Sequence, residues 1–139
     1  MMIELIGPVS ELSVDATTQV VPHDFADTAS VTLRFGTGAT GTVTAIGAAP
    51  NFNRLHFYGD KGWAEVRGTN RLEFQPLGGD VVVEEFEPVD MLRAQLETFA
   101  AAAQGQTDWP VPPADAVNGV RALVAMLESF RADGERMVV

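Results

Sequence analysis

The segment from Thr28 to Phe74 constrains the fold most, because it consists of short alternating stretches separated by glycine-containing turns. Between residues 28 and 35, apolar and polar side chains alternate with a period of two, which is typical of a strand with one buried face. Further segments suit strands for the same reason or because they are rich in β-branched residues: 40–48, 54–58, 63–67 and 71–75. The connections are too short for crossover helices, so we expect antiparallel neighbours.

The rest of the chain predicts one domain over residues 1–139 of the α+β class, with a predominantly antiparallel open-faced β-sheet and two C-terminal helices packed on one face. The expected parts are the end of a helix over 1–7, a sheet over 9–86, a helix pair over 88–134 and a short strand over 136–139. Within the sheet, the first strand is expected over 9–21 and a further strand over 80–86. Both helices, at 89–104 and from 113 to about 132, carry an apolar stripe: Val89, Leu92, Leu96, Phe99 and Ala103, then Ala116, Val120, Leu123, Leu127 and Phe130.

Composition excludes several classes of function. Nine basic residues stand against nineteen acidic ones, and a net charge of −10 disfavours nucleic acid and anionic membranes as partners. There are no cysteines and only two histidines, which leaves no thiolate chemistry and little material for a metal site. No segment approaches the length of a membrane span, and a cytoplasmic location is the default expectation.

One motif imitates a nucleotide-binding loop. Residues Gly36 to Gly41 read G-x-G-x-x-G after a strand, and Asp60 lies near the spacing of a ribose-binding acid. The fingerprint requires a helix to begin at its end, whereas the segment Thr42–Gly47 is a poor helix former. The sequence therefore favours a hairpin turn here.

No catalytic, cofactor-binding or metal-binding residue is predicted. His56 lies in the middle of a strand and His23 lies beside Asp24, so either could in principle serve an acid–base role. No serine lies in a nucleophile-elbow setting, and we interpret both histidines as structural or interfacial. An enzyme that uses one of them alone remains the least favoured alternative.

The polar face of the sheet is a candidate interface. Its Thr-rich surface also carries aromatic residues, which often anchor contacts between subunits. The predicted interface residues are Thr32, Arg34, Thr42, Thr44, His56, Tyr58 and Trp63. The alternative is a solvated sheet face, which antiparallel sheets tolerate. We expect a homo-oligomer, a dimer, through this face.

Several stretches in this order resemble one family over nearly the whole chain: Asp27–Phe35, Gly38–Val43, Phe57–Val66, Leu96–Phe99, Pro110–Val111, Asp115, Ser129 and Gly134. The chain resembles the C-terminal domain of the glucose–fructose oxidoreductase, inositol dehydrogenase and MocA-like family. In that family an N-terminal Rossmann domain binds NAD or NADP, and the sheet domain lines the substrate pocket and pairs subunits.

The resemblance implies the substrate-side and oligomerisation domain of a dehydrogenase acting on a sugar- or polyol-like hydroxyl. It places the family's catalytic histidine and aspartate before Met1, so no catalytic residue maps onto this chain. We therefore expect no cofactor bound by this chain, no catalysis by it alone, and a Rossmann domain as partner. The alternative is a free-standing dimerisation or small-ligand-binding module.

Overall fold

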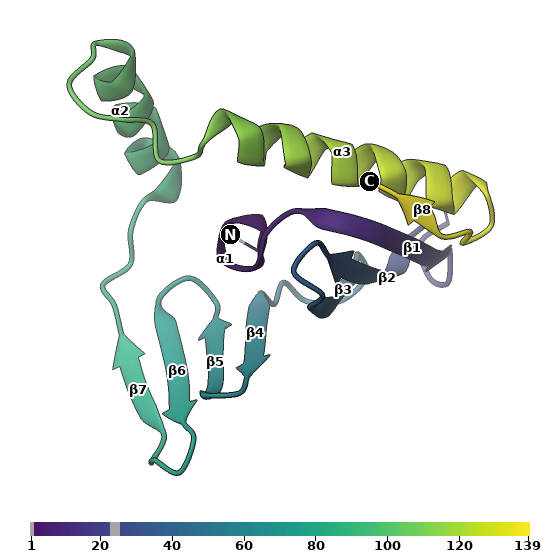
Figure 1. Ribbon diagram of the computed structural model, residues 1–139, viewed down its shortest axis with the longest axis horizontal. Coiled ribbons are helices and arrows are strands. Elements are labelled where there is room, and N and C mark those ends of the chain that lie inside the picture. The colour runs from purple at the N-terminus through teal and green to yellow at the C-terminus, as the bar shows by residue number, and fades with distance from the viewer. Residues whose placement is uncertain (1, 23–25) are drawn as a thin grey trace. The chain divides into compact units, whose positions relative to one another are not determined.

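The computed structural model describes residues 2–22 and 26–139, so the predicted pairing of His23 with Asp24 lies outside the described residues (Figure 1). The chain divides into two compact units, the first from residues 1–49 and 110–139 and the second from residues 50–109. None of the described helices is long and apolar enough to cross a membrane.

The first unit contains a four-stranded antiparallel sheet in the order β3-β2-β1-β8. Its elements are α1 (Met2–Ile6), β1 (Val9–Thr17), β2 (Thr28–Phe35), β3 (Thr40–Ile46), α3 (Pro113–Arg131) and β8 (Met137–Val138). The short helix α1 ends at Gly7, whose φ of 109° suits glycine and whose amide donates to the carbonyl of Ile3. Helix α3 lies along this sheet and contacts β1 and β8 (Figure 1).

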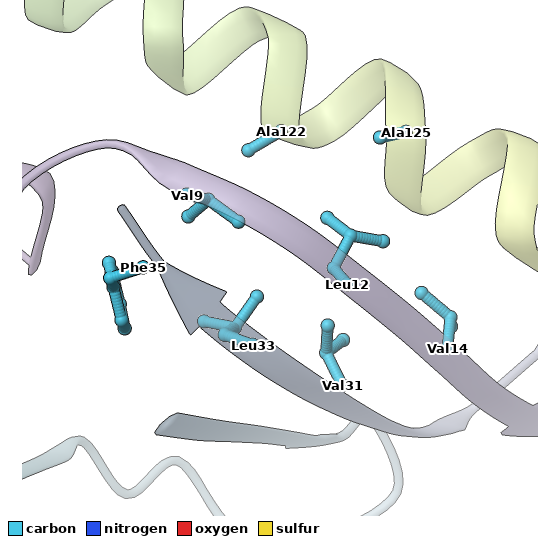
Figure 2. Packing of buried hydrophobic residues seen from close by; sticks show 8 residues of the cluster. All are labelled: Val9, Leu12, Val14, Val31, Leu33, Phe35, Ala122 and Ala125. Atoms are coloured by element: carbon cyan, nitrogen blue, oxygen red, sulfur yellow. The ribbon is translucent and has the colours of Figure 1, made fainter. Parts of the chain in front are cut away.

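The core of the first unit lies between α3 and the sheet. The buried apolar residues are Val9, Leu12, Val14, Val31, Leu33, Phe35, Ala122 and Ala125 (Figure 2). The fully buried residues of α3 are the small Ala122, Ala125 and Ser129, and the partly buried Met126 packs beside them. The apolar stripe predicted along α3 is on the opposite side of the helix and is exposed.

The hydroxyl group of one buried serine in α3 forms hydrogen bonds to β1 and to the turn before β8. Ser129 of α3 is fully buried; its Oγ accepts a hydrogen bond from the amide of Val14 at 2.9 Å and donates to the carbonyl of Glu135 at 2.7 Å. The strand β1 and the turn before β8 are therefore both fixed to the end of α3.

The first strand is shorter than predicted, because it ends at Thr17 instead of residue 21. The buried carboxylate of Asp27 accepts hydrogen bonds from the amides of Gln19, Val20 and Val21, at 3.0, 2.7 and 2.7 Å. These amides face inward to one side chain and are not available to a neighbouring strand, so the ladder stops. The same bonds, those from Val21 and Val20 above all, lower the pKa of Asp27 to about 2.

The second unit contains another four-stranded antiparallel sheet, in the order β4-β5-β6-β7. Its elements are β4 (Arg54–Gly59), β5 (Gly62–Arg67), β6 (Arg71–Pro76), β7 (Val82–Glu85) and α2 (Met91–Ala103). The two-residue loop between β4 and β5 confirms the predicted glycine hairpin. Gly62 has a φ of 137°, and a Cβ there would collide with the carbonyl oxygen of Gln75, so only glycine fits.

The α+β class, the antiparallel pairing and the C-terminal helices are confirmed. The strands do not, however, form one continuous meander, because β3 and β4 are not neighbours. The segment between them, residues 47–53, includes Pro50 and is longer than a tight hairpin turn. The glycine motif at 36–41 is the hairpin between β2 and β3, as predicted, and no helix follows it. Helix α2 begins at an Asp90 N-cap and has no buried residue.

Candidate functional site: the polar face of the second sheet

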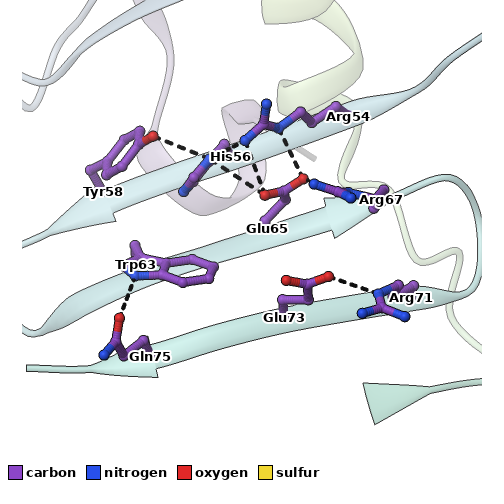
Figure 3. Close-up of polar contacts among 9 residues, drawn as sticks. All are labelled: Arg54, His56, Tyr58, Trp63, Glu65, Arg67, Arg71, Glu73 and Gln75. Atoms are coloured by element: carbon purple, nitrogen blue, oxygen red, sulfur yellow. Dashed lines mark hydrogen bonds and ion pairs between the residues drawn. The ribbon is translucent and has the colours of Figure 1, made fainter. Parts of the chain in front are cut away.

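One face of the second sheet carries an ordered array of polar and aromatic side chains, which we call the polar face (Figure 3). Its residues are Arg54, His56, Tyr58, Trp63, Glu65, Arg67, Arg71, Glu73 and Gln75. The strand register places them in three rows across β4, β5 and β6. The rows are Arg54–Arg67–Arg71, His56–Glu65–Glu73 and Tyr58–Trp63–Gln75.

Glu65 is the centre of this array and is only 4% exposed. Its Oε1 accepts a hydrogen bond from Nε of Arg67 at 2.9 Å, and its Oε2 accepts one from Nη2 of Arg54 at 3.1 Å. These bonds, the one from Arg67 above all, lower the pKa of Glu65. Two guanidinium groups therefore hold a carboxylate ionised at the middle of the sheet.

His56 links the charged rows to the aromatic row. Its ring stacks on Tyr58, with centroids 4.0 Å apart and an interplanar angle of 20°, and lies 5.3 Å from the Trp63 ring. Nδ1 of His56 lies 3.1 Å from Nη2 of Arg54, which can only donate, so Nδ1 is the acceptor. The hydrogen of the neutral ring is then on Nε2, which is buried and has no described partner.

Two further contacts complete the face. Arg71 donates to Glu73 at 2.7 Å and to Glu85 at 2.9 Å, and these carboxylates, Glu73 first, raise the pKa of Arg71. Nε1 of Trp63 donates to Oε1 of Gln75 at 3.0 Å, which orients the indole ring. The guanidinium and carboxylate groups thus satisfy one another, both within strands and between neighbouring strands.

The aromatic row of the polar face borders an open hollow. No group of three or more metal-ligating side chains occurs in the part of the chain that the structure describes. An open hollow of about 470 Å³ lies at the β4–β5 hairpin, lined by residues that include Phe57, Tyr58, Trp63 and Phe74. A partly aromatic, open hollow can take a small ligand or a side chain of another protein.

The predicted interface residues fall into two groups. Thr32, Arg34, Thr42 and Thr44 lie on β2 and β3 of the first unit, on the face away from its core, where Thr32 is directly opposite Thr42. His56, Tyr58 and Trp63 lie on the polar face of the second unit. The prediction that they form a subunit interface stays a prediction.

Sequence reasoning missed the ion pairs of Arg54, Arg67 and Arg71. A signal was available, because the turns at 60–61 and 68–70 fix the register of β4, β5 and β6. With that register the arginines fall side by side, and like charges in neighbouring strands require carboxylates close by. Glu65 and Glu73 occupy the adjacent row.

Comparison with known proteins identifies the fold. The family model described as the GFO/IDH/MocA C-terminal domain matches residues 1–65. A search of curated proteins found no match.

Among solved structures, the aldose-aldose oxidoreductase from Caulobacter crescentus, complexed with glycerol, superposes with a TM-score of 0.80 at 21% identity, over 99% of this chain and 43% of that one. An inositol dehydrogenase homolog from Azotobacter vinelandii, complexed with NADH and myo-inositol, superposes with a TM-score of 0.79 at 17% identity, over 99% of this chain and 46% of that one. The WlbA dehydrogenase from Bordetella pertussis, in complex with NADH and UDP-GlcNAcA, superposes with a TM-score of 0.75 at 19% identity, over 99% of this chain and 44% of that one.

The chain thus spans less than half the length of each of these structures. The resemblance seen in the sequence is confirmed: the chain matches the C-terminal domain of the GFO/IDH/MocA oxidoreductases, by sequence over residues 1–65 and by fold over almost its whole length.

Proposed function

We propose that this chain is the substrate-side and oligomerisation domain of an NAD(P)-dependent oxidoreductase that acts on a sugar- or polyol-like hydroxyl. The observation that carries this proposal is the match of 99% of the chain to less than half of dehydrogenases solved with NADH. The nucleotide-binding Rossmann domain would be the partner, and it would bring NAD or NADP.

The chemistry of the polar face supports a role without catalysis by this chain alone. Oxidation of a hydroxyl needs a base that can take its proton as the hydride leaves for the nicotinamide. Glu65 is engaged by two arginines, Nδ1 of His56 faces Arg54, and Nε2 of His56 is buried. Neither side chain therefore offers a free basic atom to a substrate.

The exposed aromatic row supports a second part of the proposal, pairing of subunits through the sheet. Tyr58 is 78% exposed and lies on the ring of His56, so it presents a flat apolar surface that is already ordered. Ordered aromatic side chains lose little entropy on binding and anchor many interfaces.

Isothermal titration calorimetry of the 139-residue chain with NADH tests the first part. We expect no heat of binding, because no residue of this chain is assigned to the cofactor. A micromolar affinity for NADH would refute the proposal that a separate Rossmann domain, and not this chain, binds the cofactor.

The hollow at the β4–β5 hairpin favours a second candidate function, binding of a small ligand by the chain on its own. Tryptophan fluorescence with millimolar myo-inositol distinguishes the two, because Trp63 lines the hollow and Trp109 does not. A saturable change that disappears in Trp63→Phe would favour the small-ligand module. An unchanged spectrum is the result expected of a domain that needs its partner to complete the substrate pocket.

A further inference from the structure

The histidine of the polar face makes a contact that only its neutral form allows. Nδ1 of His56 lies 3.1 Å from Nη2 of Arg54 and 3.2 Å from the hydroxyl oxygen of Tyr58. A guanidinium group can only donate a hydrogen bond, whereas a phenol can donate or accept one. The lone pair of Nδ1 therefore accepts the bond from Arg54. A proton bound to Nδ1 takes up that lone pair, so this contact cannot persist when the ring is charged.

Acceptors for the charged ring are already close to Nδ1 of His56. Oε2 of Glu65, the residue directly opposite on β5, is 3.8 Å from this nitrogen. A charge-assisted hydrogen bond between nitrogen and a carboxylate is about 2.7–2.9 Å long, so a shift of about 1 Å closes the gap. The hydroxyl of Tyr58 can turn its hydrogen away and accept from Nδ1 without a change of distance.

Arg54 can leave His56 and still remain bound to Glu65. Its Nε lies 2.9 Å from Oε1 of Glu65, and this contact is separate from the one between Nη2 and Oε2 at 3.1 Å. When the charged His56 takes over Oε2, the Nη2 end of Arg54 is released to solvent, which already reaches 47% of that side chain. The buried carboxylate therefore keeps the same number of donors in both states.

The other contacts of the His56 ring suit both protonation states. Nε2 carries a hydrogen in the neutral and in the charged form, so its buried position does not distinguish between them. The ring stacks on Tyr58, with centroids 4.0 Å apart, and lies 5.3 Å from Trp63. Aromatic faces attract a cation, so these neighbours hold the charged ring as well as the neutral one. The side chain is 19% exposed, so water can deliver the proton.

Charges of both signs surround the His56 ring. The charged groups that face it from the described strands of the second unit are Arg54 on β4, Arg67 and Glu65 on β5, and Glu73 on β6. The carboxylates favour uptake of a proton by the ring, whereas the guanidinium groups and the burial of Nε2 oppose it. The hydrogen bond from Arg67 above all lowers the pKa of Glu65, so this carboxylate is ionised at pH 5 and above. Histidine is the side chain that ordinarily changes charge between pH 5 and 8, so a response to protons is expected in this range.

We propose that His56 is a proton-operated switch of the polar face. In the neutral state Nδ1 accepts a hydrogen bond from Arg54. In the charged state Nδ1 donates to Glu65, with Tyr58 as a second acceptor, and Arg54 holds Glu65 through its Nε. The switch goes beyond the proposed function, because it needs only contacts within β4 and β5. Its effect on subunit pairing rests on that function: a two-fold axis brings both copies of His56 to one interface, where each gains a positive charge as the pH falls.

NMR spectroscopy of the chain with nitrogen-15-labelled histidine and arginine tests the switch directly. The sequence has two histidines, and His23→Gln leaves His56 as the single one. At pH 8 we expect Nε2 to carry the hydrogen and Nδ1 to be bare, and at pH 5 we expect both nitrogens to be protonated. The Nε signal of Arg54 should shift with the same midpoint. A ring that is still neutral at pH 5, hydrogen on Nδ1 at pH 8, or an Arg54 signal that does not follow the histidine would overturn the switch.

Arg93 is the matched control within the same spectra. It is also an exposed arginine in an ion pair with a glutamate, and its Nε lies 2.7 Å from Glu97. Because its described side-chain contact is with Glu97 and not with a histidine, its Nε signal should stay constant from pH 8 to pH 5. An equal shift of Arg93 and Arg54 would mean that the change is not specific to His56, and would contradict the proposal.

Two variants of His56 lock the two states. His56→Asn keeps an acceptor oxygen near the place of Nδ1 and cannot bind a proton, so Arg54 should keep its pH 8 signal down to pH 5. His56→Phe keeps a ring to stack on Tyr58 but has no acceptor, so Arg54 should show its pH 5 signal at both values. An Arg54 shift in His56→Asn as large as in the wild type would assign the transition to another group and refute the switch.

Sedimentation equilibrium at pH 8 and pH 5 tests the effect on pairing. We expect the dimer dissociation constant of the wild-type chain to rise about tenfold or more toward pH 5, because like charges then meet at the interface. In His56→Asn the change should be much smaller, and this variant corrects for the titration of all other groups. Equal changes in the two proteins would refute control of pairing by His56. A wild-type chain that is monomeric at both pH values would refute the pairing itself, and the NMR titration would still decide the switch.

Discussion

The two sheets have the same strand number and the same antiparallel pairing, yet different forces hold them. In the first sheet, six strand residues and two of α3 form a buried apolar core. In the second sheet the only buried side chain of a described strand residue is that of Glu65. Ion pairs join β4 to β5 and β6 to β7, and two more lie within β5 and within β6. The first sheet therefore owes its stability mainly to the hydrophobic effect of a buried core. The second depends on hairpin geometry, polar contacts and apolar rows that are only partly buried.

We infer from this difference that the first sheet has mainly a structural role and that recognition falls to more accessible faces. A buried core tolerates little change, whereas a sheet with two accessible faces can alter its side chains for a ligand or a partner. The residues that we assign to recognition accordingly lie on the second sheet and on outward faces of the first unit. Mutations in the two sheets should separate stability from recognition, and the effects can be ranked.

The largest effect is expected from Phe35→Ala. Phe35 is 1% exposed in the first core, and its truncation leaves a cavity that should cost about 3–5 kcal/mol of unfolding free energy. Phe74→Ala in the second sheet is the matched control, because Phe74 is only partly buried. Urea unfolding followed by circular dichroism measures both variants. An equal loss for the two would refute the contrast between the sheets.

The second effect is that of Ser129→Ala, which removes a hydroxyl without creating a large cavity. The amide of Val14 and the carbonyl of Glu135 would both lose their bond to Ser129, and a buried unsatisfied polar group costs about 1–3 kcal/mol. Ser129→Cys keeps the volume with a much weaker donor and should fall between wild type and alanine. If thermal unfolding places the alanine variant at the stability of wild type, the hydroxyl does not bridge α3 to β1.

The sequence predicts those parts of the fold that depend on neighbouring residues, and it misses those that depend on residues far apart in the chain. The alternation in Thr28–Phe35 and the glycine hairpin at 59–62 predict strands correctly, because each depends on local chemistry. The end of β1 at Thr17 was missed, since it depends on Asp27, ten residues later, which draws three amides away from the ladder. The buried side of α3 was missed because Ala122, Ala125 and Ser129 are weakly apolar, and hydrophobicity points to the wrong side.

The polar face of the second sheet was also predicted only in part. Tyr58, Trp63 and His56 were predicted to lie together because alternation within strands is local. The pairs Arg54–Glu65 and Arg71–Glu85 depend on the register between strands, which a sequence reveals only after each turn length is known. The pairs Arg67–Glu65 and Arg71–Glu73 lie within one strand, two residues apart, and are a local signal that the sequence reasoning missed. The separation of β3 from β4 into different sheets has no local signal beyond Pro50.

The third effect is that of Asp27→Asn, and it depends on pH. Hydrogen bonds in the folded state lower the pKa of Asp27 from its ordinary 3.8 to about 2. The stabilisation by the carboxylate is therefore complete above about pH 4 and is lost as the pH falls toward 2. We expect the difference in stability between wild type and Asp27→Asn to shrink over that range in urea titrations. A difference that stays constant from pH 5 to pH 2 would show that the charge of Asp27 contributes nothing.

The smallest effect is expected from Glu65→Gln, and it should be confined to the second sheet. The substitution keeps the shape and an acceptor oxygen but removes the charge that Arg67 and Arg54 share. Because those bonds lower the pKa of Glu65, its contribution is present above the ordinary pKa of 4.5 and falls as the carboxylate is protonated. Amide hydrogen exchange should accelerate in β4 and β5 and stay unchanged in β1 and β2.

Glu84→Gln is the matched control for this last variant, because Glu84 is an exposed carboxylate of the same sheet, on strand β7, with no ion pair among the described residues. Faster exchange in β1 after Glu65→Gln would mean that the polar network also supports the first core. The two sheets would then not be stabilised independently. Exchange that is slow and unchanged in both sheets would mean that hairpin geometry alone holds the second one, and the network would be left with recognition as its role.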